Sequence, residues 1–168
     1  MKTLKIFAIA LAACVALVSC SKNNADSGNT NSEVYSSPAV KCTYTLNDNV
    51  RKAMTMTLSV DGTKACDFSK AEDSISFGLT PGKSGTITFE SKYNSSATFT
   101  EAADFTGNIN IVVGAIKNGT EVIAYTETMQ FSSEGMPVDK IPELMAKKEK
   151  SLSLKYTVAN NGQVTVTK

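Results

Sequence analysis

The chain has 168 residues, with 17 basic and 16 acidic side chains, four cysteines and neither histidine nor tryptophan. This length is typical of a single domain. Because histidine is absent, the Ser-His-Asp and Cys-His nucleophile systems, His-ligated zinc or iron sites and imidazole pH switches are excluded. We therefore expect no enzymatic activity, no cofactor and no metal.

The first 20 residues have the pattern of an export signal. Lys2 and Lys5 precede an uncharged apolar run at residues 6–18. A run of this length rises only about 20 Å as a helix, which is less than the roughly 30 Å hydrocarbon core of a bilayer. The segment at residues 1–19 therefore predicts a signal peptide and not a membrane span.

The tetrapeptide Leu17-Val18-Ser19-Cys20 follows the apolar run. It resembles the lipobox of bacterial lipoproteins, which implies cleavage before Cys20 and anchoring of its thiol by acyl chains such as palmitate. The alternative is an ordinary secretory signal with an incidental Cys20, but Leu17 is a poor match to the small residue that such signals need at this position. Ser21 stands where an aspartate would retain a lipoprotein in the inner membrane. The resemblance therefore implies the outer membrane, on either its periplasmic or its external face.

Residues 20–37 contain few large apolar side chains and predict a lipidated N-terminus with a flexible tether before a folded domain at residues 38–168. After removal of residues 1–19 the chain keeps 15 basic and 16 acidic side chains, a net charge near −1. Arg51 is its single arginine. Without a basic cluster the chain is not suited to bind nucleic acid.

Apolar and polar residues alternate with a period of two through most of residues 38–168, which predicts β-strands. Asp61-Gly62, Asn118-Gly119 and Asn161-Gly162 predict tight turns. Residues 139–150 are the one expected helix, because apolar residues share one side and lysines lie near the end. The expected strands are 40–46, 54–60, 63–68, 74–79, 85–93, 97–100, 108–117, 121–131, 152–158 and 163–167.

This layout predicts an all-β, immunoglobulin-like β-sandwich of about seven to ten strands, with one short helix before the C-terminal hairpin. It resembles the immunoglobulin-like domains of small lipoproteins from Gram-negative gut bacteria. The resemblance implies a non-enzymatic interaction module of the cell envelope that binds a protein or glycan partner. The alternative is a lipocalin-like barrel that carries a small apolar ligand, although the Gly-x-Trp that usually begins such barrels is absent.

Cys42 and Cys66 are the only cysteines after Cys20, and an exported protein can form a disulfide between them. A simple meander would place them two strands apart, about 9.6 Å, which is beyond the roughly 7 Å limit for a bridge. The expected bridge therefore requires their strands to be neighbours or to lie in facing sheets. The alternatives are two buried thiols that pack as small apolar groups, or a metal site that lacks its other ligands.

The densest acidic group contains Asp67, Glu72 and Asp73. It lacks the spacing of a calcium loop and the setting of a paired-carboxylate hydrolase, so it predicts a solvated loop. Within it, Asp73-Ser74-Ile75 resembles the acceptor for O-glycosylation of exported proteins in some Gram-negative gut bacteria. The resemblance implies a glycan on Ser74.

Two further groups favour structural roles. Met54 and Met56 alternate with apolar residues, so they predict core packing in preference to a soft-metal site. A basic group near the end of the expected helix predicts a solvated face in preference to a lipid-binding surface. That group contains Lys147, Lys148 and Lys150.

Overall fold

The computed structural model describes residues 33–168. The expected signal peptide, the expected lipidation site Cys20 and most of the expected tether lie outside the described residues. The described part begins two residues before the first strand, β1, which starts at Tyr35.

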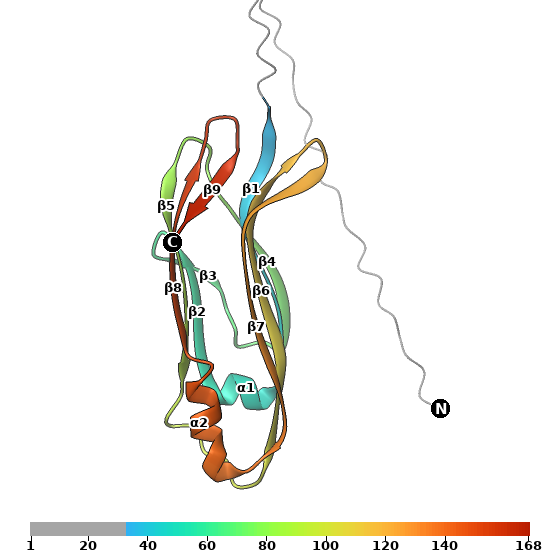
Figure 1. Cartoon of the computed structure of the whole chain (residues 1–168), viewed down its shortest axis with the longest axis vertical. Helices are drawn as coiled ribbons and strands as arrows, with labels where there is room; N and C mark the ends of the chain where they lie inside the picture. Colours follow the sequence, from blue (N-terminus) through green and yellow to red (C-terminus); the bar gives the residue numbers. More distant parts are fainter. Residues whose placement is uncertain (1–32) are drawn as a thin grey trace, which may run out of the picture. The chain divides into compact units, whose positions relative to one another are not determined.

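Residues 33–168 form nine strands, two short α-helices and one 3-10 turn (Figure 1). In chain order they are β1 (Tyr35–Leu46), α1 (Asp48–Ala53), β2 (Met54–Val60), β3 (Thr63–Cys66), β4 (Glu72–Gly78), β5 (Ser84–Tyr93), β6 (Ala103–Lys117), β7 (Thr120–Met136), η1 (Val138–Lys140), α2 (Ile141–Ala146), β8 (Lys150–Val158) and β9 (Val164–Thr167).

The strands build two sheets that face each other (Figure 1). The first has the order β4-β1-β6-β7 and the second the order β3-β2-β5-β8-β9, and all neighbours pair antiparallel. Each sheet keeps two open edges, so the strands do not close into a barrel. The fold is therefore the β-sandwich that the alternating pattern predicts, with α2 before the C-terminal hairpin as expected.

The core lies between the sheets because each inner face carries the apolar half of the alternation. In β1, Val40, Cys42, Tyr44 and Leu46 are buried, while the residues that alternate with them, at 41, 43 and 45, are exposed or half-buried. Met54 and Met56 belong to the same core, as their pattern predicts. The largest fully buried side chains include Phe89, Phe105, Leu46, Leu58, Ile87 and Ile109.

Two of the predicted tight turns have the geometry that Asx-Gly pairs favour. Asp61 and Gly62 have φ values of 50° and 77°, and Asn118 and Gly119 have 52° and 78°. Positive φ at both central residues matches the right-handed twist of the adjoining strands. These turns set the register of the β2–β3 and β6–β7 hairpins.

The structure differs from the expected elements at four places besides the ends of β6 and β7, which extend to Ala103 and Met136. β1 begins inside the segment assigned to the tether, because Tyr35 and Ser36 pair with the end of β6. The expected strand at 97–100 is absent; Phe99 instead packs edge-on against Phe105, with 5.6 Å between ring centroids. The expected helix at 139–150 is shorter and divides into η1 and α2.

The fourth difference is α1, a helix that the alternating pattern does not predict. The Asn47 side chain caps it by accepting a hydrogen bond from the Val50 N–H at 3.0 Å. Val50 and Ala53 are buried beneath it. Six residues are too few for helical periodicity to be visible in the sequence.

Candidate functional site

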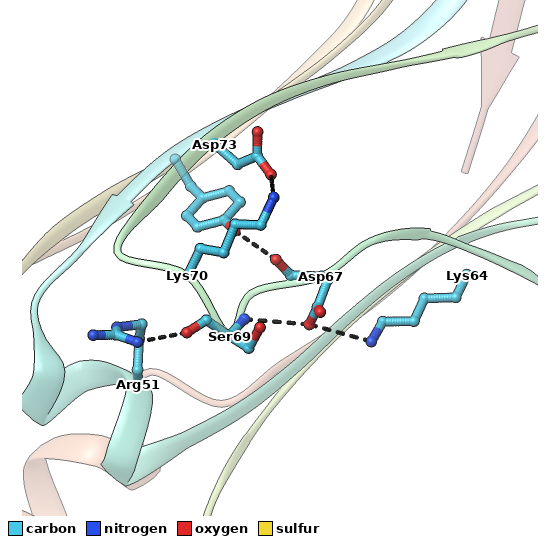
Figure 2. Close-up of polar contacts among 7 residues, drawn as sticks. Arg51, Lys64, Asp67, Ser69, Lys70 and Asp73 are labelled. Atoms are coloured by element: carbon cyan, nitrogen blue, oxygen red, sulfur yellow. Dashed lines mark hydrogen bonds and ion pairs between the residues drawn. The ribbon is translucent and has the colours of Figure 1, made fainter.

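A charged loop at residues 67–71 connects β3 of one sheet to β4 of the other (Figure 2). Its Phe68 side chain is buried, with its ring centroid 4.9 Å from that of Tyr44 and 6.1 Å from that of Phe89. Tyr44 belongs to β1 in the first sheet and Phe89 to β5 in the second. Phe68 therefore anchors the charged loop between the two sheets.

Three hydrogen bonds hold the backbone of the charged loop. The Tyr44 hydroxyl donates to the Asp67 carbonyl at 2.5 Å, and Nη1 of Arg51 donates to the Ser69 carbonyl at 2.5 Å (Figure 2). The Leu46 N–H donates to the Ala71 carbonyl at 2.7 Å. Because Arg51 belongs to α1, the unpredicted helix supplies one of the supports of this loop.

Four side chains place alternating charges on and beside the charged loop. Lys64 pairs with Asp67 at 3.3 Å, and Lys70 pairs with Asp73 at 2.8 Å. Hydrogen bonds from Ser69 and Lys64 hold the pKa of Asp67 below its usual value. Hydrogen bonds from Lys70 and the Ser74 N–H do the same for the pKa of Asp73. Three of these four side chains are exposed, and ion pairs at a protein surface contribute little to stability, so the pairs can open when a partner binds.

A shallow depression of about 410 Å³ lies between the edge strands β3 and β4. The four charged side chains line it together with Ala65, Cys66 and Ile75. A second depression of about 360 Å³ lies on another side, between β7 and the segment that joins α2 to β8. Within residues 33–168, no group of three or more Cys, Asp or Glu side chains is arranged to hold a metal.

The predicted disulfide is wrong for this structure, in which Cys42 and Cys66 are free thiols. Their strands, β1 and β3, do lie in facing sheets, which is one of the two arrangements that a bridge requires. The side chains share a hydrogen bond, which raises the pKa of Cys42 and lowers the pKa of Cys66. Both are buried in the core. They therefore pack as the small apolar groups of the alternative interpretation.

We expect both thiols to be unreactive until the domain unfolds. Cys42 and Cys66 are only 1% and 2% exposed, so a water-soluble disulfide reagent cannot reach them in the native protein. A secreted chain that begins at residue 21 should release two thiols in denaturant and almost none without it. Absence of reactive thiols in the denatured, unreduced chain would contradict the free-thiol state and demonstrate a bridge.

The candidate glycosylation residue, Ser74, lies exposed on β4, an edge strand of the first sheet. Its N–H donates to Oδ1 of Asp73 at 2.8 Å. Asp67 lies in the charged loop, as predicted, whereas Glu72 and Asp73 begin β4. The three acidic residues therefore do not share one loop.

The basic group near α2 is only partly a solvated face. Lys147 is exposed, as predicted. Nζ of Lys148, however, donates to the Gln130 carbonyl at 2.9 Å, and Lys150 pairs with Glu127. These two contacts connect the segment after α2 to β7. They join the two sheets, since β7 belongs to the first sheet and β8, which begins at Lys150, to the second.

Three tyrosines should make the domain sensitive to alkali. Burial raises the pKa values of Tyr44, Tyr125 and Tyr156 to about 12 from their usual 10. The folded state therefore keeps phenolic protons that the unfolded chain loses first, so stability is complete below about pH 10 and falls as the pH rises toward 12. The urea midpoint of unfolding should therefore decrease between about pH 10 and pH 12. In Tyr156→Phe the midpoint should decrease less with pH. A midpoint that stays constant over this pH range would contradict the prediction.

The two facing sheets define this chain as an all-β sandwich protein. Comparison of the chain with protein families, curated proteins and solved structures finds no match. No helix in residues 33–168 is both long enough and apolar enough to cross a bilayer. The function is therefore argued from the residues of this chain.

Proposed function

We propose that this protein is a non-enzymatic interaction module of the bacterial cell envelope, anchored in the outer membrane by lipid on Cys20, and that it binds a protein or glycan partner. The lipobox-like Leu17-Val18-Ser19-Cys20 supports the anchor. The separation between Cys20 and the first strand supports a domain held close to the membrane by its N-terminal segment.

The proposal that the partner binds at the surface rests on one observation, the filled interior of the sandwich. Buried side chains of both sheets form one hydrophobic cluster in the space between them. A carrier of an apolar ligand needs that space for its cargo, typically some hundreds of Å³. An interior occupied by side chains favours recognition at the surface over the alternative lipocalin-like carrier.

The charged loop is the surface that we assign to partner recognition. Its backbone is fixed by Phe68, Tyr44 and Arg51, so a partner would bind it without a large ordering cost. Exposed Asp67 and Lys70 in the loop, with Lys64 and half-buried Asp73 beside it, offer acceptors and donors side by side, which suits the polar surfaces of proteins and glycans.

Site-specific photocrosslinking in living cells tests this assignment. A photoreactive residue at Lys70, in the charged loop, should give a discrete crosslinked product. The matched control is Lys155, another exposed lysine, on β8. Products of equal yield from both positions, or none from Lys70, would contradict a role for the charged loop.

Two measurements address the location and the carrier alternative. Protease treatment of intact cells should digest the domain if it faces outward, and spare it, like a periplasmic marker, if it faces the periplasm. An apolar fluorescent dye should show no saturable binding to the native protein. Saturable binding at one site would favour the carrier.

Modification of Ser74 is an expected property of the protein in its native host. The exposed position of Ser74 on an edge strand leaves room for a glycan. The intact mass should exceed that of the lipidated polypeptide, and Ser74→Ala should remove the excess. Ser76→Ala, the next exposed serine on β4, is the matched control and should leave the mass excess in place.

A further inference from the structure

One end of the domain combines the chain entry with three exposed apolar side chains. β1 begins there, beside the hairpin that joins β6 to β7 (Figure 1). We call Val34, Val122 and Ile123 the apolar tip; their exposed fractions are 68%, 40% and 54%. Among the described residues only one other large apolar side chain is exposed, Val138, beside α2 at the opposite end (Figure 1).

At this end the β6–β7 hairpin bends away from the second sheet (Figure 1). Farther along β7, buried Met129 and Phe131 alternate with exposed Gln130. Residues 118–123, by contrast, are exposed without interruption. Because successive side chains of a strand point to opposite faces, the exposure of both Val122 and Ile123 means that neither face of the hairpin is covered there. Both apolar side chains are available to an external surface.

The start of the domain is held firmly at the same end. The Tyr35 N–H donates to the Asn161 carbonyl at 2.7 Å, and the Asn161 side chain donates to the Glu33 carbonyl at 2.9 Å. Glu33 also pairs with Lys117 at 2.5 Å. The chain therefore enters the domain at a fixed point next to Val34.

The polar groups around the apolar tip suit a membrane interface. Lys117 pairs with Glu33, and Lys41 pairs with Glu121 at 2.6 Å, so these ions are neutralised in pairs. Nζ of Lys117 also lies 5.6 Å from the centroid of the Tyr35 ring. Tyrosine and lysine beside apolar side chains are typical of the headgroup region, where one end of each side chain stays hydrated.

We propose that the apolar tip inserts into the headgroup region of the bilayer that anchors the protein, an inference that rests on the proposed lipidation of Cys20. The 13 residues between Cys20 and Val34 span at most roughly 50 Å, and they end at this tip. The anchor therefore keeps the tip at a high effective concentration at the membrane, where a small apolar contact is sufficient. The opposite end of β1, which contacts the charged loop, then lies about 40 Å farther from the bilayer.

Tryptophan fluorescence tests this orientation without background, because the chain contains no tryptophan. The full lipidated protein carrying Ile123→Trp is reconstituted in vesicles of phosphatidylethanolamine and phosphatidylglycerol, with and without a nitroxide near the headgroups. We expect a shift of the emission to shorter wavelength and a loss of intensity with the nitroxide lipid. Val138→Trp, at the opposite end, is the matched control and should show neither change.

Flotation of the same vesicles tests the lipid anchor on Cys20 separately from the insertion of the apolar tip. Protein that does not float disproves the lipid anchor and, with it, the insertion. If the Ile123→Trp protein floats but its emission is neither shifted nor quenched, the insertion alone is overturned. A shift without quenching would place the tip against another protein or a second copy, and equal quenching in the Val138→Trp protein would mean that the domain lies flat; both results overturn the proposal.

Discussion

Replacement of Phe68 by alanine is expected to lower the free energy of unfolding by about 3–5 kcal/mol, the usual cost of removing a buried phenylalanine. Phe68 is 6% exposed and fills the space between Tyr44 and Phe89. Its removal deletes the one side chain by which the charged loop is held in the core. The loop should therefore lose its fixed backbone as well as stability.

Urea denaturation and limited proteolysis check the two parts of this result. Phe68→Ala should lower the urea midpoint strongly and make the native protein cleavable near Lys70. Phe99→Ala is the matched control, because Phe99 is half-buried and contacts Phe105 away from this loop. It should cost less and leave the loop resistant. A loss below about 1 kcal/mol for Phe68→Ala would contradict the anchoring role.

Replacement of Cys20 by alanine is expected to abolish lipidation completely, since the thiol is the proposed acylation site. The variant should incorporate no labelled palmitate and should keep residues 1–19, because cleavage depends on the lipidated cysteine in the lipobox family. Metabolic labelling and intact-mass measurement provide the two readouts.

Cys42→Ala is the matched control for this experiment. Cys42 is buried in the sandwich core, so its replacement should leave palmitate incorporation unchanged. Palmitate label that persists in Cys20→Ala would disprove the assignment of the anchor. Loss of label in both variants would indicate a defect of export and not of lipidation.

Local sequence patterns were sufficient to predict most of the strands. β2 and β5 have an apolar inner face and a more polar outer face, so apolar and polar residues alternate along each strand and the alternation is visible in the sequence. Asn118-Gly119 predicted its hairpin because only residues that tolerate positive φ satisfy that turn. Strand alternation and turn geometry depend only on residues close together in the sequence and on which side of the strand faces water.

The candidate site could be predicted only in part. The acidic group of Asp67, Glu72 and Asp73 was predicted to be a solvated loop. Its support by Tyr44, Arg51 and Phe68 was not predicted. Arg51 and Ser69 are brought together by α1, whose only sequence signal was the capping residue Asn47. Arg51 and Ser69 are 18 residues apart, and a contact over such a separation produces no periodic pattern in the sequence.

By itself, the sequence determined the β-strand character of the domain, its two Asx-Gly hairpins and the lipobox-like segment, because each depends on residues close together in the chain. The tertiary structure alone decided that Cys42 and Cys66 lie as free thiols in facing sheets, that Lys148 connects the α2–β8 segment to β7, and that the apolar tip is exposed at the end where the chain enters the domain. The physical reason is that strand order and sheet packing depend on many contacts between residues far apart in the sequence. They cannot be predicted from any one segment of the chain.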